Sequence, residues 1–147
     1  SSIAFSQSLD GGLTWSAPIK VNQTPDLANN LNEQAFLPMV HVLDDGTVAV
    51  SYYDFRSNTA DNGATTPTEA FLAHCHPASE DCSVAESWNE EVPVTDAPFD
   101  SRKAPVARGF FLGDYVGLGQ NGSAFFPFFT VTTATDPANI VTREVGQ

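Results

Sequence analysis

The stretch that decides the fold reads Ser8-Leu9-Asp10-Gly11-Gly12-Leu13-Thr14-Trp15. Residues 3–5 before it and residues 15–21 after it contain apolar side chains that favour β-strands. The Asp10-Gly11-Gly12 segment has hairpin-turn chemistry, because aspartate accepts hydrogen bonds from turn amides and glycine adopts positive φ. The pattern therefore predicts a tight turn between two antiparallel strands.

The spacing Ser-x-Asp-x-Gly-x-Thr-Trp closely resembles the Asp-box of the bacterial neuraminidase repeat. In sialidases and their relatives this motif lies between the two outer strands of a β-propeller blade. The resemblance implies a structural role for all its fixed positions, which are Ser8, Asp10, Gly12, Thr14 and Trp15. The resemblance predicts the fold of the chain more directly than its activity, because proteins with one fold can have many functions. The alternative is a chance Asp-Gly hairpin beside a tryptophan.

The composition is typical of one all-β domain. The chain has 147 residues, enough for a buried core, and its ten Gly and ten Pro favour short strands and turns. No run of about 18 apolar residues occurs, so we expect no membrane insertion. The formal charge is −12, which disfavours nucleic acid as a partner because phosphate binding needs clustered cations. The same acidity is common in secreted proteins and serves solubility.

Cys75 and Cys82 are the only cysteines. We interpret them as a local disulfide, which implies an oxidising compartment. The alternative is a metal site that adds His74 and His76 to the two cysteines, although the spacing matches no standard zinc pattern. The glycosylation-acceptor triplet at Asn22 and a second one at Asn121 are consistent with secretion. We therefore expect an extracellular protein.

A repeat supports the propeller interpretation. Residues 88–94 match residues 15–21, with a tryptophan followed by apolar residues four and six places on. A polar connector, a strand, a glycine turn and a second strand follow each copy, and the copies lie roughly 75 residues apart. In the second copy the cysteine loop replaces the Asp-box turn. We expect strands at residues 35–43 and 47–53, joined by a turn at residues 44–46, and further strands at residues 70–75 and 138–142.

These elements predict β-propeller blades of four antiparallel strands, with about nine strands in the chain. Residues 1–33 form an outer hairpin and a connector, residues 34–94 a complete blade, and residues 95–147 a connector and three strands of the next blade. Because a closed ring needs roughly four to eight blades, the remaining blades come from a longer chain or from other copies. An ordinary β-sandwich is the alternative fold.

Propeller geometry places the turns at the ends of alternate strands on opposite faces. The Asp-box, the turn at residues 44–46 and the turn at residues 120–122 are expected on the bottom face. The connectors at residues 22–34 and 95–109 and the loop at residues 56–69 are expected on the top face, where propellers usually bind ligands.

Two further segments resemble sialidase-like propellers and lie on the expected top face. They are Tyr52-Tyr53-Asp54-Phe55-Arg56 and the longer segment at residues 110–118, which contains Gly113-Asp114-Tyr115. In sialidases an arginine triad binds the substrate carboxylate, a tyrosine assisted by a glutamate is the nucleophile, and an aspartate is the general acid/base. The resemblance suggests catalytic and substrate-binding groups here, although no segment matches the nucleophile region or the arginine motif of the first blade.

The candidate catalytic residues are Asp114, Tyr115 and Asp54, and the candidate substrate-binding residues are Arg56, Arg108, Arg102 and Glu33. The alternatives are local: Arg56 pairs with Asp54, and Asp114 forms a hydrogen-bonded cap. We expect no cofactor and no resident metal, with calcium bound by Asn58, Asp61 and Asn62 as the alternative, although that loop lacks an EF-hand pattern.

Two functions follow from the resemblance. The first is an extracellular glycan-active enzyme, a sialidase-like glycoside hydrolase or a fragment of one, with a polysaccharide lyase as a variant. The second is a non-catalytic carbohydrate-binding or scaffold module. Whether the chain is an enzyme stays open at this stage, and a carbohydrate is the expected ligand in both cases.

Overall fold

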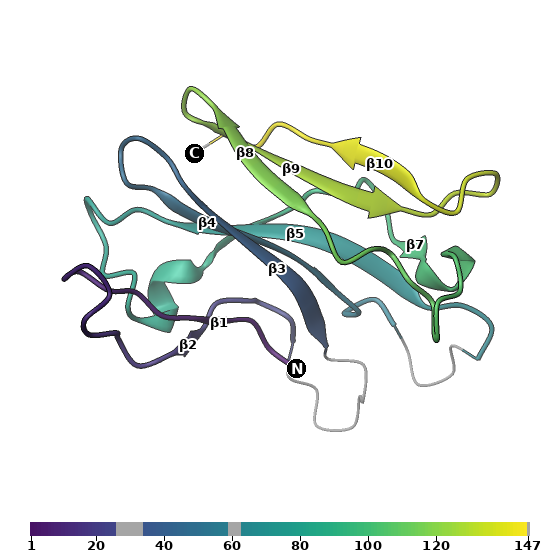
Figure 1. Ribbon diagram of the computed structural model, residues 1–147, viewed down its shortest axis with the longest axis horizontal. Coiled ribbons are helices and arrows are strands. Elements are labelled where there is room, and N and C mark those ends of the chain that lie inside the picture. Colours follow the sequence, from purple (N-terminus) through teal and green to yellow (C-terminus); the bar gives the residue numbers. More distant parts are fainter. Residues whose placement is uncertain (26–33, 59–62, 147) are drawn as a thin grey trace.

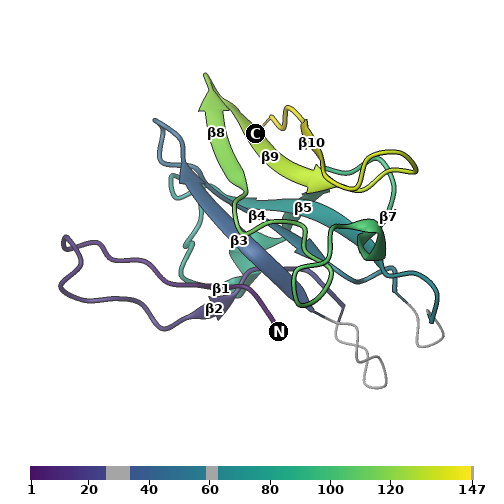
Figure 2. The same cartoon turned by 45° about the vertical axis from the view of Figure 1, so that its right-hand side comes forward.

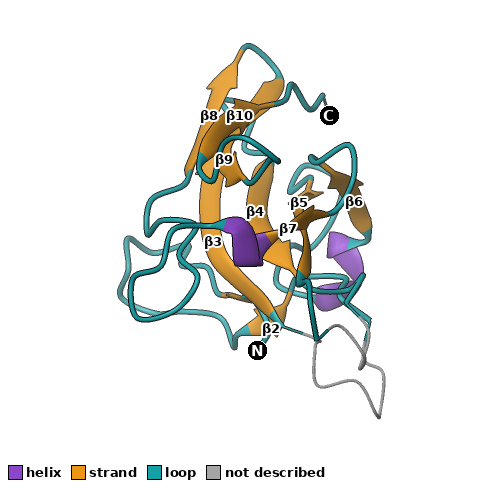
Figure 3. Ribbon diagram, turned by 90° about the vertical axis from the view of Figure 1, so that its right-hand side faces the viewer, coloured by secondary structure: helices purple, strands orange, loops and turns teal. Residues whose placement is uncertain are grey.

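Short antiparallel strands make up almost all of the regular structure in the computed structural model, which describes residues 1–25, 34–58 and 63–146 (Figure 3). The expected all-β, antiparallel fold class is confirmed. The two helical segments are single 3₁₀ turns, η1 at Ala85–Trp88 and η2 at Ser101–Lys103.

The central sheet is an antiparallel meander in the order β3-β4-β5-β6. Its strands are β3 (Ala35–Val42), β4 (Val48–Asp54), β5 (Pro67–Cys75) and β6 (Glu90–Pro93). Strand β4 is buried at every position, which fits its run of β-branched and aromatic residues and its place between two neighbours. A short strand that the sequence did not indicate, β7 (Phe99–Asp100), pairs with the beginning of β5.

Strand β3 is irregular where its sequence contains proline. The register with β4 shifts between Phe36 and Met39, and Leu37 has a positive φ of 51°. Pro38 lies within this shift and has no N–H to donate to the ladder. The strand therefore continues past the proline through a β-bulge, as edge strands allow.

Two smaller sheets pack on the two faces of the meander (Figures 1 and 2). The hairpin of β1 (Ala4–Phe5) and β2 (Ile19–Lys20) covers one face. The sheet β10-β9-β8 covers the other, with strands β8 (Gly117–Asn121), β9 (Ala124–Val131) and β10 (Asn139–Thr142). The result is three layers with a hydrophobic core on each side of the central sheet.

Successive side chains of β5 point to opposite faces of the sheet and so pack in both cores. Phe71, Ala73 and Cys75 belong to the core beneath the β1–β2 hairpin, which also contains Trp88. Ala70 and Leu72 belong to the core beneath the β8–β10 sheet. Apolar side chains thus point to both faces of a strand that is covered on both sides.

The turns lie at the two ends of the molecule, as alternating strand directions require. Figure 1 shows the Asp-box hairpin tip, the β3–β4 turn and the β8–β9 turn toward one end, on the left of the view. Residues 101–116, drawn in green, lie toward the other end. A hydrogen bond of 3.0 Å between His41 Nε2 and Gln120 Oε1 links β3 to β8.

Candidate functional site

The most extensive polar network of the described residues begins at Asp54, the last residue of β4. Its side chain is fully buried. The Thr24 hydroxyl donates to Oδ2 at 2.6 Å, and the backbone N–H of Arg56 donates to Oδ1 at 3.1 Å. The Arg56 Nε donates to Oδ2 at 2.8 Å. Both carboxylate oxygens of Asp54 are therefore occupied by protein groups.

Arg56 joins Asp54 to a second carboxylate, that of Glu91 on β6. Its Nη1 lies 2.6 Å from Glu91 Oε2, and its Nη2 lies 3.0 Å from Glu91 Oε1 and 2.7 Å from Asp54 Oδ2. The guanidinium carbon also lies 3.5 Å from the ring centroid of Phe71, a cation–π contact. Bidentate pairing with a carboxylate is the strongest geometry available to arginine. The expected Arg56–Asp54 pair is thus present within a larger network.

Glu91 is the residue whose protonation this network perturbs. The Tyr52 hydroxyl donates to Glu91 Oε1, and the backbone N–H of Gln23 donates to the same oxygen at 3.3 Å. Burial raises the pKa of the Glu91 carboxyl to about 7. The Arg56 guanidinium acts in the opposite direction because it stabilises the charged form. Burial and the guanidinium thus act on the same carboxyl with opposite signs.

Glu91 and Tyr52 are members of this site that the sequence did not identify. Tyr52 lies inside the quoted Tyr-Tyr-Asp segment and is only 2% exposed, and the hydrogen bond from its hydroxyl to Glu91 places it in the network. Glu91 is distant from Arg56 in sequence, and the β5–β6 register brings it alongside. The network connects the end of β4, strand β6 and residues 23–24. Its two carboxylates are buried, whereas the Arg56 side chain is 20% exposed.

Three other predicted site residues, Arg108, Asp114 and Tyr115, lie in the segment between η2 and β8. Asp114 and Tyr115 are exposed, Tyr115 at 93%. Within the described residues, neither side chain has a hydrogen-bond or ion-pair partner, so the structure does not join them to the Asp54 network. Arg108 is also exposed, with a positive φ of 63°.

Arg102 and Glu33 complete the predicted set. The Arg102 Nη1 donates to the carbonyl of Gly63, and its backbone N–H donates to Asp100 Oδ1 at 3.1 Å. Glu33 lies outside the described residues, as do Asp61 and Asn62 of the candidate calcium loop. Calcium binding by that loop stays an alternative that the described residues do not test.

The residues of the segment that resembles an Asp-box form a closed set of local hydrogen bonds. Asp10 accepts from the Thr14 backbone N–H at 2.9 Å and from the Thr14 hydroxyl at 2.7 Å. The Ser8 hydroxyl donates to Asp10 at 2.8 Å and accepts from the Gly12 N–H at 2.8 Å. The Trp15 Nε1 donates to the Gly12 carbonyl at 3.2 Å. The Thr14 bonds lower the pKa of Asp10 to about 2, and Asp10 acts as a turn-forming residue here.

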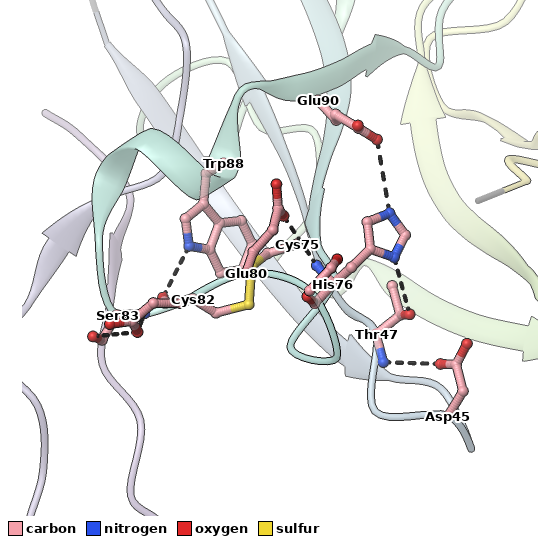
Figure 4. Close-up of a disulfide and its surroundings, with 11 residues drawn as sticks. Asp45, Thr47, Cys75, His76, Glu80, Cys82, Ser83, Trp88 and Glu90 are labelled. Carbon is pink, nitrogen blue, oxygen red and sulfur yellow. Dashed lines mark hydrogen bonds and ion pairs between the residues drawn. A yellow bond between two sulfur atoms is a disulfide. The ribbon is translucent and has the colours of Figure 1, made fainter.

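The cysteine loop is closed by the predicted disulfide between Cys75 and Cys82, whose Cα atoms are 5.9 Å apart (Figure 4). The buried Trp88 donates from Nε1 to the Cys82 carbonyl at 3.1 Å. The alternative metal site, in which both cysteines are ligands, is wrong because their sulfurs are bonded to each other.

A cavity of about 410 Å³ lies between the β6–β7 connection and strands β9 and β10. Phe99 and Phe129 form part of its wall, and Asp96 and Arg143, which pair at 3.1 Å, also line it. None of the predicted site residues that the structure describes lines this cavity.

Comparison with family models, curated proteins and solved structures gives no match. Among the described residues, no helix has the length and apolar character needed to cross a membrane. The functional argument therefore depends on the residues and their geometry.

Proposed function

We propose that this chain is part of an extracellular, sialidase-like β-propeller that acts on glycans. Three features support the architecture: a four-stranded antiparallel meander, an Asp-box hairpin on one face and a further antiparallel sheet on the other. Edge strand β3 exposes Val40 and Val42, and edge strand β10 exposes Ile140. Exposed apolar edges are typical of sheets that pack against further chain.

The proposed reaction is glycoside hydrolysis with Asp114 as the general acid/base. The observation that carries this role is that Asp114 and its neighbour Tyr115 are exposed and have no side-chain partner among the described residues. An aspartic acid in this position can protonate the leaving glycosidic oxygen as its bond to the anomeric carbon breaks. The resulting carboxylate can then take a proton from the water molecule whose oxygen bonds to that carbon. Asp54 is assigned a different role, because its buried oxygens hold Arg56 and Thr24.

The second candidate is a non-catalytic carbohydrate-binding module. The pairing of Arg56 with two carboxylates of the protein favours this second candidate, because a guanidinium that is already paired is not free to bind a substrate carboxylate. The exposed Arg108, Phe110 and Tyr115 would then form the binding surface, with a cation for a sugar carboxylate and aromatic rings for apolar sugar faces. The disulfide supports an oxidising, extracellular location for either function.

Hydrolysis and binding assays on the same variants separate the two candidates. We expect the chain to release sugar from a panel of aryl glycosides that includes a sialoside, and we expect Asp114→Asn to abolish release without changing the circular dichroism spectrum. Asp96→Asn is the matched control, because Asp96 is an exposed aspartate in a different loop. Binding without release would support the module. The absence of both would contradict the proposed function.

A further inference from the structure

A second cluster of chemically active side chains lies at the Asp-box end of the molecule, on the face of the meander that packs against the β8–β10 sheet. His74 on β5 is directly opposite Glu90 on β6. His76 follows His74 by two residues, so both imidazoles project from the same side of the chain, and their ring centroids are 5.0 Å apart. Cys75 between them points to the opposite face and forms the disulfide.

The donor atoms of these three side chains converge. His74 Nε2 lies 2.9 Å from Glu90 Oε2, and His76 Nε2 lies 3.7 Å from the same oxygen. One donor atom from each residue can be chosen so that all lie within 4.8 Å of one another. Donors of a tetrahedral zinc ion at about 2.0–2.2 Å from the metal are about 3.4 Å apart. Small side-chain rotations would bring these three atoms to that spacing.

His74 provides an independent indication of a missing ligand. Its side chain is only 5% exposed, and neither ring nitrogen makes a hydrogen bond within the described structure. Glu90 Oε2 lies 2.9 Å from Nε2, an ion-pair distance, so Nδ1 is the ring nitrogen without any partner in the described structure. Buried polar atoms are normally paired.

The surroundings orient His76 as metal-binding histidines are usually oriented. Its Nδ1 lies 3.3 Å from the Thr47 hydroxyl, and the Thr47 backbone N–H donates to Asp45 Oδ1 at 2.9 Å. When Nδ1–H donates to Thr47, the lone pair of Nε2 is directed toward Glu90. Figure 4 shows this chain of contacts from Asp45 through Thr47 and His76 to Glu90.

We propose that His74, His76 and Glu90 bind a zinc-class divalent transition-metal ion, with water as the fourth ligand. Two imidazoles and a carboxylate suit zinc, whereas calcium prefers an all-oxygen set. The ion would join the end of β5 to the beginning of β6 directly beside the disulfide. This inference does not depend on the proposed glycan activity, because it concerns the opposite end of the molecule.

Zinc titration of the full chain by calorimetry tests the site, with cobalt absorption spectra to report nitrogen and oxygen coordination. We expect one zinc ion per chain. His76→Asn and Glu90→Gln should each weaken binding by about tenfold or more. His41→Asn and Glu86→Gln are the controls, because His41 bonds Gln120 elsewhere and Glu86 is an exposed acid in η1. Both controls should retain wild-type affinity.

Each other outcome would overturn the proposal. Equal affinity in wild type, His76→Asn and Glu90→Gln would assign the binding to surface carboxylates. The absence of binding by the folded chain would show that the cluster holds no metal. Circular dichroism of every variant separates a lost site from a lost fold, and both test residues are more exposed than His74, which limits their effect on packing.

Discussion

Replacing Arg56 by alanine tests whether the Asp54 network is a structural crosslink. The substitution leaves the carboxylate of Asp54, which is fully buried, and that of Glu91, at 9% exposure, without their cation. Removal of one partner of a buried ion pair typically costs about 3–5 kcal/mol, because the remaining charge is uncompensated. The loss of the guanidinium over Phe71 acts in the same direction. We therefore expect the free energy of unfolding to fall by about 3–5 kcal/mol.

The assay is urea unfolding followed by the fluorescence of the buried Trp88. Arg143→Ala is the matched control: it removes an exposed ion pair with Asp96 and should cost less than about 1 kcal/mol. A loss for Arg56→Ala that is no larger than the control loss would refute the reasoning. If the same variant also lost glycoside hydrolysis, that result would indicate that Arg56 binds the substrate.

The pH dependence of this variant follows from Glu91. Because burial raises its folded pKa from 4.5 to about 7, the contribution of Glu91 to stability is fully present below pH 4.5 and is lost as the pH rises through about 7. The Arg56 guanidinium offsets part of this loss in the wild type. We therefore expect the Arg56→Ala penalty to increase between about pH 5.5 and pH 8. A penalty that is independent of pH would show that Glu91 does not titrate in this window.

Three further changes have defined outcomes. Cys82→Ser removes the disulfide that closes a loop with a sequence separation of 7, and it should lower the free energy of unfolding by about 2–3 kcal/mol in urea titrations. A free energy of unfolding equal to that of the oxidised wild type would contradict the stabilising role of the disulfide. Trp88→Ala empties a fully buried position beside Phe5 and should lower the free energy of unfolding by about 3–5 kcal/mol. Because this variant lacks the fluorescent reporter, its urea unfolding is followed by circular dichroism, and a loss no larger than that of Arg143→Ala would contradict the packing role of Trp88. Asp10 contributes to hairpin stability above its unfolded pKa of 3.8, and this contribution is lost as the pH falls through about 2. The Thr14 amide NMR signal should therefore titrate with a midpoint near pH 2, because this amide donates to Asp10. A midpoint at or above pH 3.8 would show that the turn bonds are absent.

Local patterns in the sequence predicted the strands well, because β-branched and aromatic runs bounded by glycine turns have few other conformations. The turn at residues 44–46 and the strands on either side of it are examples. The short strand β7 was missed because two residues carry no periodic pattern, and it forms only where β5 offers an edge. The cysteine spacing likewise predicted the disulfide, because seven residues suffice for a local loop.

The candidate sites depended on tertiary register, which no local pattern contains. Sequence placed Asp54 and Arg56 together because they are two residues apart, but Glu91 reaches Arg56 only through the β5–β6 pairing. The same pairing brings Glu90 to His74, so the metal site proposed here contains a carboxylate that the sequence did not indicate, whereas the cysteines of the alternative site form the expected disulfide. Sequence grouped Asp114 with Asp54 by resemblance alone, and the structure shows no contact that joins them within its described residues.

The most direct test of the central claim is an NMR titration of the isotopically labelled chain with sialic acid and with neutral monosaccharides. A propeller segment that handles glycans at the end opposite the Asp-box predicts saturable shifts in the Arg108–Tyr115 amide signals, with the Asp10 and Thr14 signals unchanged. Shifts that are absent at saturating sugar, or that occur only at the Asp-box end, would contradict the account.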